Sequence, residues 1–234
     1  MSLYRNLDPV KTIETLETLN RRIEERFPSS GLAGVCRELC SIANSSKAKA
    51  EWIATPNYFI RFLVAVIVVA FMVMLVYSIS AMEISLGKFD LGELVQITEA
   101  ALNEIVLVGA AVFFLVTIEV RIKRARALEA LHELRTIAHV IDMHQLTKDP
   151  GRLGKNMVPT GSSPREEMTS YNLMRYLDYC SEMLSLTGKI AALYAQDFRD
   201  AVVLAAINEI ETLTTGLSRK IWQKIMILHR MDSD

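Results

Sequence analysis

The chain has 234 residues, of which 51% are hydrophobic and 23% are charged, and its mean hydropathy of +0.24 is high for a soluble protein. With 26 Lys and Arg against 27 Asp and Glu, the formal net charge is -1, which excludes a strongly basic protein built to wrap nucleic acid. Cys36, Cys40 and Cys180 are too few for a disulfide framework and favour a reducing compartment. The composition therefore favours a membrane protein made of long helices.

Residues 1–57 are predicted to form two short amphipathic helices on the cytosolic side. Asp8 offers an N-cap and Pro9 fits the first helical position. Apolar residues then recur about every 3.6 positions, at Ile13, Leu16, Leu19, Ile23 and Phe27. The turn at residues 28–31 ends this helix, and a second helix is expected from about residue 32 to residue 50.

Two apolar runs are long enough to cross a bilayer. Residues 58–82 predict a first transmembrane helix, because about 20 residues with about 1.5 Å rise each span a hydrocarbon core of about 30 Å. Residues 100–120 predict a second one. The apolar run within it, residues 105–118, covers only about 21 Å, so the span needs its flanking residues. A buried helix of a soluble domain is the alternative for this second run.

The charges around the two runs predict the topology. Residues 83–99 are predicted to form an acidic outer loop and the start of the second helix, in which Glu83, Asp90, Glu93 and Glu99 outnumber Lys88. The basic flanks are Lys47, Lys49 and Arg61 before the first run and Arg121, Lys123, Arg124 and Arg126 after the second. Because positive flanks stay in the cytoplasm, both termini are expected on the cytoplasmic side of a plasma membrane, specifically a bacterial inner membrane.

Beyond the second run, the sequence predicts three long cytosolic helical segments. Residues 121–147 extend the second transmembrane helix, which starts near Asp90 and has at most one kink, at Gly109. Its apolar stripe consists of Leu128, Leu131, Leu134, Ile137, Ala138 and Ile141. Residues 148–163, rich in Gly, Pro and Ser, read as a loop.

Residues 164–234 are predicted to complete a helical bundle with two helices. The first is expected to start at Ser163 and Pro164 and to bend at Gly188 if anywhere. It carries Leu173, Tyr176, Leu177, Cys180 and Leu184 on one face. The second is expected to run from about residue 197 to residue 231. Its inward positions are Leu204, Ile207, Ile210, Leu217, Ile221, Ile225 and Leu228.

Two polar residues in the second span are candidates for a pore entrance. A carboxylate inside a transmembrane helix is costly, so Glu104 is expected to face other helices or water. In a ring of subunits, copies of Glu104 and Asn103 would line a cation entrance. The alternative is an interfacial glutamate where the helix enters the membrane.

His132, Arg135, His139 and Asp142 form a predicted polar ridge, because their i, i+3, i+7, i+10 spacing keeps them on one helical face. One interpretation is a pH-sensing or self-association edge. A metal site would use His139 with Asp142, because His132 lies two turns away. The simplest alternative is a solvated or hydrogen-bonded face of the bundle.

Two basic groups are candidates for contact with anionic lipid or an acidic partner. They are Lys148, Arg152 and Lys155 in the loop, and Arg219, Lys220, Trp222 and Lys224 in the last helix. An ordinary solvated surface explains both groups equally well. The loop lacks the full spacing of a phosphate-binding loop, so nucleotide binding is disfavoured.

No arrangement of nucleophile, base and acid can be assembled from this sequence, so we expect that the protein is not an enzyme and needs no cofactor or metal. The predicted fold is that of an all-α integral membrane protein, a two-span transmembrane helical hairpin with a cytosolic helical bundle. We expect a homo-oligomeric scaffold whose partners are membrane lipid, further copies of the chain and a cytosolic protein, but not nucleic acid. The alternative function is an oligomeric ion channel or carrier with Glu104 near its outer mouth. An enzyme would require a metal at His139 and Asp142.

Overall fold

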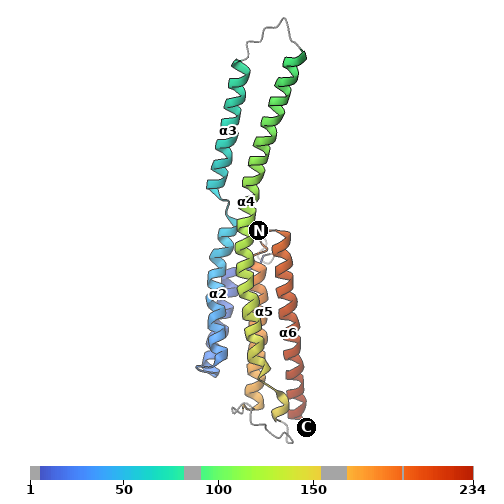
Figure 1. Ribbon diagram of the computed structural model, residues 1–234. Coiled ribbons are helices and arrows are strands. Elements are labelled where there is room, and N and C mark those ends of the chain that lie inside the picture. The colour runs from blue at the N-terminus through green and yellow to red at the C-terminus, as the bar shows by residue number, and fades with distance from the viewer. Residues whose placement is uncertain (1–5, 82–90, 154–167, 197, 234) are drawn as a thin grey trace. The chain divides into compact units, whose positions relative to one another are not determined.

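The computed structural model describes residues 6–81, 91–153, 168–196 and 198–233, and these are helical apart from short turns and links, with no strand (Figure 1). The all-α prediction is therefore confirmed for this part of the chain. The elements are α1 Pro9–Arg26, α2 Gly31–Ala54, α3 Tyr58–Ala81, α4 Leu91–Leu146, the 3₁₀ turn η1 Pro150–Leu153, α5 Ser170–Leu193 and α6 Ala201–Ser233.

The chain divides into two compact units. Residues 55–125 form one, which we call the hairpin unit. Residues 1–54 and 126–234 form the other, the bundle unit. The α4 helix contributes to both, because it continues without a break through Gly109 and past residue 125.

The start of α1 follows the predicted signals. The Asp8 side chain accepts a hydrogen bond from the backbone N–H of Val10 at 2.9 Å, and Pro9 occupies the first turn. The turn into α2 places Ser29 at a φ of 55°, a left-handed conformation that is uncommon outside glycine. Ser30 then caps α2 by accepting from the N–H of Ala33 at 3.1 Å. Both the N-cap of α1 and the turn that ends it are thus confirmed.

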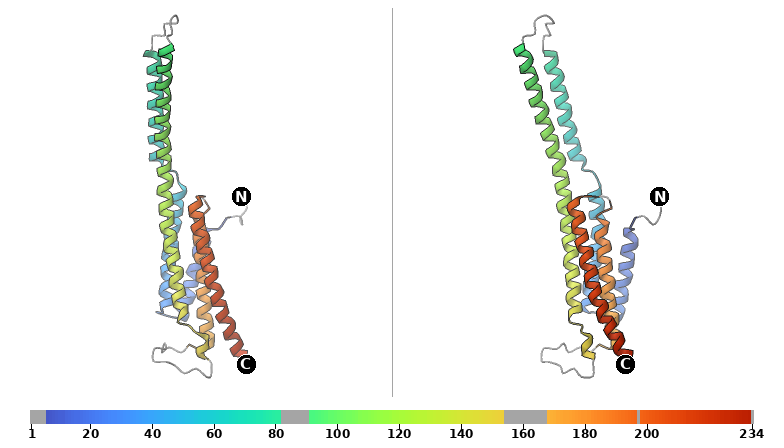
Figure 2. Two further views of the ribbon diagram at one scale, coloured as in Figure 1. Left: turned by 45° about the vertical axis from the view of Figure 1, so that its right-hand side comes forward. Right: turned by 90° about the vertical axis from the view of Figure 1, so that its right-hand side faces the viewer.

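The bundle unit buries one continuous apolar core between α1, α2, α5, α6 and the second part of α4, and these helices run alongside one another (Figure 2). Its fully buried large side chains include Leu16 and Ile23 of α1, Leu39 of α2, Leu134 of α4 and Leu184 of α5. The apolar stripe that the sequence assigns to residues 128–141 faces this core, with only Leu128 partly exposed. Burial of these side chains is the main stabilising term for helices that would not persist alone.

Two details of the bundle differ from the sequence-based expectation. The helix α5 begins at Ser170, capped by the Thr169 hydroxyl, rather than continuing from the predicted start at Ser163 and Pro164, which itself lies outside the described residues. In α6 the prediction for Leu204 is wrong, because Leu204 is 40% exposed and Val203 is buried in its place. The cap at Asp200 starts the helix there, and the inward stripe begins with Val203.

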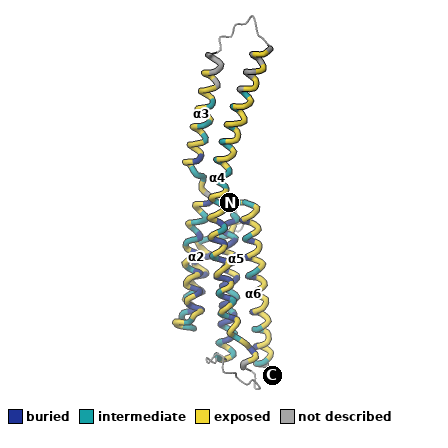
Figure 3. The backbone as a smooth tube through the Cα atoms, in the orientation of Figure 1, coloured by how far each residue is buried: buried dark blue, intermediate teal, exposed yellow. Residues whose placement is uncertain are grey.

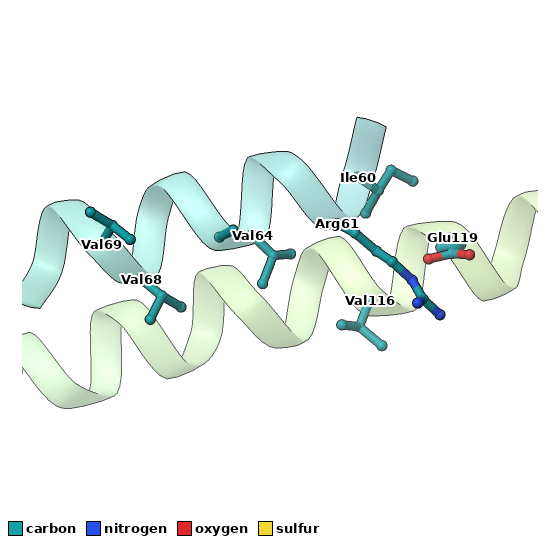
Figure 4. A pocket seen from close by; sticks show the side chains of 8 residues that line it. Ile60, Arg61, Val64, Val68, Val69, Val116 and Glu119 are labelled. Atoms are coloured by element: carbon teal, nitrogen blue, oxygen red, sulfur yellow. The ribbon is translucent and has the colours of Figure 1, made fainter. Parts of the chain in front are cut away.

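The hairpin unit consists of α3 and the first part of α4, which lie side by side in opposite directions (Figures 1 and 4). Residues that are buried or half-buried recur at spacings of three and four residues along both helices, as in a coiled coil. They are Ile60, Val64, Ile67 and Phe71 in α3 and Ala101, Glu104, Val108, Ala111, Leu115 and Ile118 in α4, where Val112, Thr117 and Val120 are also half-buried. We call these two rows of residues the seam. The lower exposure of Glu104 than of its neighbours Asn103 and Ile105 indicates that it lies on the side of α4 that is turned toward α3.

Candidate membrane hairpin and its polar end

The surface of the hairpin unit outside the seam is apolar and exposed. The most apolar windows of 18 residues have a mean hydropathy of 2.2 in the helical stretch ending at Met74 and 2.3 in α4. Only 6% of the first window and none of the second is buried, and the tube of these helices is mostly yellow, the colour of exposed residues, in Figure 3. Phe62, Val73 and Phe113 are 67%, 63% and 73% exposed. Two helices of this protein are therefore long and apolar enough to cross a membrane.

Soluble monomers rarely expose a contiguous apolar surface of this extent. Two helices have only one face each to offer the other, so the remaining faces stay uncovered whatever the seam buries. A contiguous patch of this kind on a soluble monomer would drive aggregation.

One end of the hairpin unit is closed by a compact polar cluster that fixes the link between α2 and α3. Glu119 of α4 pairs with Lys123 one turn later at 3.0 Å, and both side chains are more than four-fifths buried. Glu119 also accepts a hydrogen bond from the backbone N–H of Asn57 at 3.1 Å. Lys123 donates to the carbonyl of Thr55 at 2.8 Å. The pair thus satisfies two backbone groups of the link, residues 55–57, which has no helical partner for them.

Arg61 stands beside this cluster at the mouth of an open groove between α3 and α4 (Figure 4). The groove has a volume of about 520 Å³ and continues from Arg61 past valines of both helices, among them Val64, Val68 and Val116. It is therefore charged at one end and apolar along its length.

The predicted pore residues differ in their surroundings. Glu104 is half-buried on the seam, whereas its neighbour Asn103 is exposed. The structure therefore does not place both side chains on one surface. A charged carboxylate in the apolar surroundings of α3 costs free energy, so Glu104 remains a candidate functional residue.

The four residues of the predicted polar ridge differ in their contacts. Arg135 forms an ion pair with Glu209 of α6 at 3.3 Å, and Asp142 accepts a hydrogen bond from Gln145 at 2.6 Å. His132 and His139 are exposed. Within the described residues no three His, Cys, Asp or Glu side chains gather as they would to hold a metal ion.

His144, which the sequence places off the ridge, has the most structured environment of the histidines in this region. Its ring lies against the start of α2 at Gly31, and Nδ1 is 3.4 Å from the hydroxyl of Tyr176 on α5. Burial, followed by the nearby charge of Lys148, lowers the pKa of His144 below its usual value. No periodic pattern identifies such a residue, because its neighbours come from distant parts of the chain.

The predicted basic contacts fall into two groups. Arg219, Lys220 and Trp222 are exposed on α6. Lys224 instead donates hydrogen bonds to the carbonyls of Gln145 at 2.7 Å and Lys148 at 3.0 Å, so it caps the end of α4.

In the predicted loop group, the Lys148 ammonium lies 5.0 Å from the centre of the Tyr176 ring. The Arg152 side chain and all of Lys155 lie outside the described residues.

A cluster of arginines and tyrosines that the sequence did not reveal joins α1 to α5. Arg22 and Arg175 lie over the ring of Tyr179 at 5.3 Å and 4.8 Å from its centre. Burial alone would raise the pKa of the Tyr179 phenol, but hydrogen bonds from Arg175 and Arg26 and the nearby positive charges lower it. Arg22 pairs with Glu182 of α5, and Arg175 pairs with Asp178 on its own helix. The Arg22–Glu182 pair and the contact of Arg22 with the Tyr179 ring therefore link α1 to α5.

The cysteines lie within the bundle. Cys36 and Cys180 are buried and Cys40 is half-buried. Contact with Cys40, then burial, raises the pKa of Cys36, and burial raises that of Cys180 to about 12. The hydrogen bond with Cys36 lowers the pKa of Cys40. A thiol with a raised pKa is a poor nucleophile, so Cys36 and Cys180 behave as small core residues.

Comparison of the chain with protein-family models, with curated proteins and with solved structures finds no match.

Proposed function

We propose that this protein is an integral membrane scaffold. The hairpin unit anchors it by two transmembrane helices, and the helical bundle is presented on the cytoplasmic face. The observation that carries the proposal is the exposed apolar surface of α3 and α4, which is supported by the concentration of basic residues at one end of the hairpin. Oligomers of the chain and docking of a cytosolic protein on the bundle belong to the same proposal.

The arrangement of polar groups supports insertion in this orientation. Lys123 and Glu119 neutralise each other, so they enter the boundary region as a pair rather than as two isolated charges. Arg61 and Arg121 are exposed near the same end, where long basic side chains reach the headgroups. Trp52, at the end of α2, stacks under Arg126 at 3.9 Å.

A role as scaffold is supported by the character of the bundle. Some of its ionisable side chains link helices, such as Lys224 to the end of α4 and Arg135 to Glu209 of α6. A rigid helical surface with exposed Trp222 and Met226 is suited to docking another protein.

A channel or carrier is the second candidate, and the position of Glu104 on the seam favours it. A half-buried carboxylate turned toward a neighbouring helix is the usual arrangement along an ion pathway. Two helices enclose no pathway, so this function requires several copies.

Membrane extraction and labelling test the anchor. The protein should stay with membranes washed in alkaline carbonate and dissolve only with detergent. In a chain without its native cysteines, a cysteine at Ser85 should react with an impermeant maleimide added outside intact cells. A matched cysteine at the exposed Ser41 of α2 should react only after permeabilisation. Release by carbonate, or the reverse labelling pattern, would contradict the proposal.

Flux from liposomes separates the two functions. A scaffold should give no flux above that of empty vesicles for any of several cations. Cation flux that is lost in Glu104→Gln and kept in Asn103→Ala would favour the channel over the scaffold.

A further inference from the structure

We propose that the groove beside Arg61 is a binding site for one anionic phospholipid of the cytoplasmic leaflet. The phosphate would pair with the Arg61 guanidinium and an acyl chain would lie along the valines of the groove. The inference rests on the proposed membrane insertion and adds to it a specific ligand class and site.

The residues at the mouth of the groove carry a net positive charge, which favours binding of an anion. Two positive groups, Arg61 and Lys123, meet a single carboxylate, Glu119, which already accepts from Lys123 at 3.0 Å and from the Asn57 N–H at 3.1 Å. Arg61 remains exposed beside that satisfied pair and carries the surplus charge (Figure 4). A guanidinium presents a planar fork of donors that matches two phosphate oxygens.

The apolar part of the groove fits a chain rather than a compact ligand. Val64 and Val68 follow Arg61 at about 4.5 Å and about 10.5 Å along the helix axis. Valine has few rotamers, so this lining keeps its shape without a ligand. An unfilled groove would also forfeit the dispersion contacts of its walls, so an acyl chain there gains contacts at little conformational cost to the protein.

Charge argues against a second copy as the occupant. All copies inserted in one orientation bring the same basic residues to the same depth. A second hairpin in this groove would therefore place its own Arg61 and Arg121 against the surplus charge already there. Anionic lipids, in contrast, are attracted to this positive charge. They are present at this depth, because they give the cytoplasmic leaflet its negative surface potential.

Native mass spectrometry of the full chain in dodecylmaltoside tests the proposal. Dioleoylphosphatidylglycerol and dioleoylphosphatidylcholine, which differ in headgroup charge, are titrated separately. We expect one tightly bound phosphatidylglycerol per protomer and a preference of about fivefold over phosphatidylcholine, the contribution typical of one basic side chain near a membrane.

Matched variants distinguish this site from general attraction. Arg61→Gln should abolish the preference, whereas Arg121→Gln removes an exposed charge outside the groove and should retain it. Val68→Phe fills the groove and should weaken binding of both lipids. Val73→Phe adds the same volume at a 63% exposed position outside the groove and should not.

Three results would overturn the inference. Equal binding of the two lipids, or equal loss in Arg61→Gln and Arg121→Gln, would show attraction without a site. A disulfide between cysteines introduced at Val68 of two copies, formed even with excess phosphatidylglycerol, would make the occupant a second chain. These results would leave the membrane anchor intact. A chain that remains dissolved without detergent would instead refute the anchor and the lipid site together.

Discussion

Gly31 begins α2 at a point where a side chain has no room. A Cβ added there would lie 2.5 Å from Cε1 of His144, whereas one added at Gly34, in the same helix, would meet nothing within 4 Å. Gly31→Ala must therefore displace the His144 ring, and we expect it to destabilise the bundle by about 1–3 kcal/mol. Gly34→Ala should stabilise it by up to about 1 kcal/mol, because alanine is the better helix former.

Tryptophan fluorescence is a suitable measurement for this pair. Trp52 and Trp222 are the only two tryptophans of the sequence, and both lie in the bundle unit. Urea unfolding in detergent, followed at this signal, reports the bundle without the hairpin. If the two alanine variants shifted the midpoint equally, the proposed contact between Gly31 and His144 would be wrong.

His144 should make the bundle less stable in acid. Its pKa in the folded chain lies below the ordinary value of 6.5, because burial and Lys148 disfavour the charged ring. Between those two pKa values the unfolded chain binds more protons, so stability falls as the pH is lowered through 6.5. In urea unfolding at pH 7.5 and 5.5, His144→Gln should reduce this loss and the exposed His139→Gln should not. An unchanged pH dependence in His144→Gln would contradict the assignment.

At the scale of elements, the link between α2 and α3 depends on two side chains of α4. Removing the Glu119 carboxylate leaves the Asn57 N–H without its acceptor and Lys123 without its ion pair. A hydrogen bond to a charged group contributes about 1.5–3 kcal/mol, so in Glu119→Ala we expect the Asn57 amide to exchange with deuterium about 10 to 100 times faster. Arg121→Gln, on the same helix, is the control. Equal protection in Glu119→Ala and the wild type would show that the link is held by other contacts.

The helices were predictable from sequence to the extent that their determinants are local. Asp8 and Pro9 set the start of α1 because capping involves residues within one turn, and the apolar periodicity located the core stripe of α4. Leu204 was misassigned because Val203 and Leu204 are adjacent apolar residues, and only packing against α5 selects between them. The seam position of Glu104 was open for a similar reason, since a uniformly apolar helix gives no periodic signal.

The polar clusters were less predictable. The hydrogen bond from the Asn57 N–H to Glu119 joins residues 62 positions apart, which no local pattern reveals. Lys224 was assigned to lipid or partner contact, while its acceptors are the carbonyls of Gln145, in the last turn of α4, and of Lys148, just after that helix ends. Contacts of this kind depend on how helices pack, and a single sequence carries no direct record of that packing.

For the whole molecule, self-association is the property that the exposed hairpin predicts. Gly109 lies on an exposed face of α4, and no atom outside its own neighbourhood approaches its Cβ position within 4 Å. Small residues on such faces let transmembrane helices approach closely. We expect cross-linked oligomers in mild detergent that weaken several-fold in Gly109→Leu and persist in Val106→Leu, an exposed apolar control. Mass determination that finds only monomer of the wild-type chain would exclude self-association.

The chain passes twice between the two units. One passage is the uninterrupted α4 helix, and the other is the short stretch at residues 55–57, whose backbone is held to α4 through Asn57 and Thr55. Because proline lacks an amide hydrogen and its ring clashes with the preceding turn of a helix, a proline near residue 125 would break the first passage. The contacts of residues 55–57 with Glu119 and Lys123 lie within the hairpin unit and should survive that substitution.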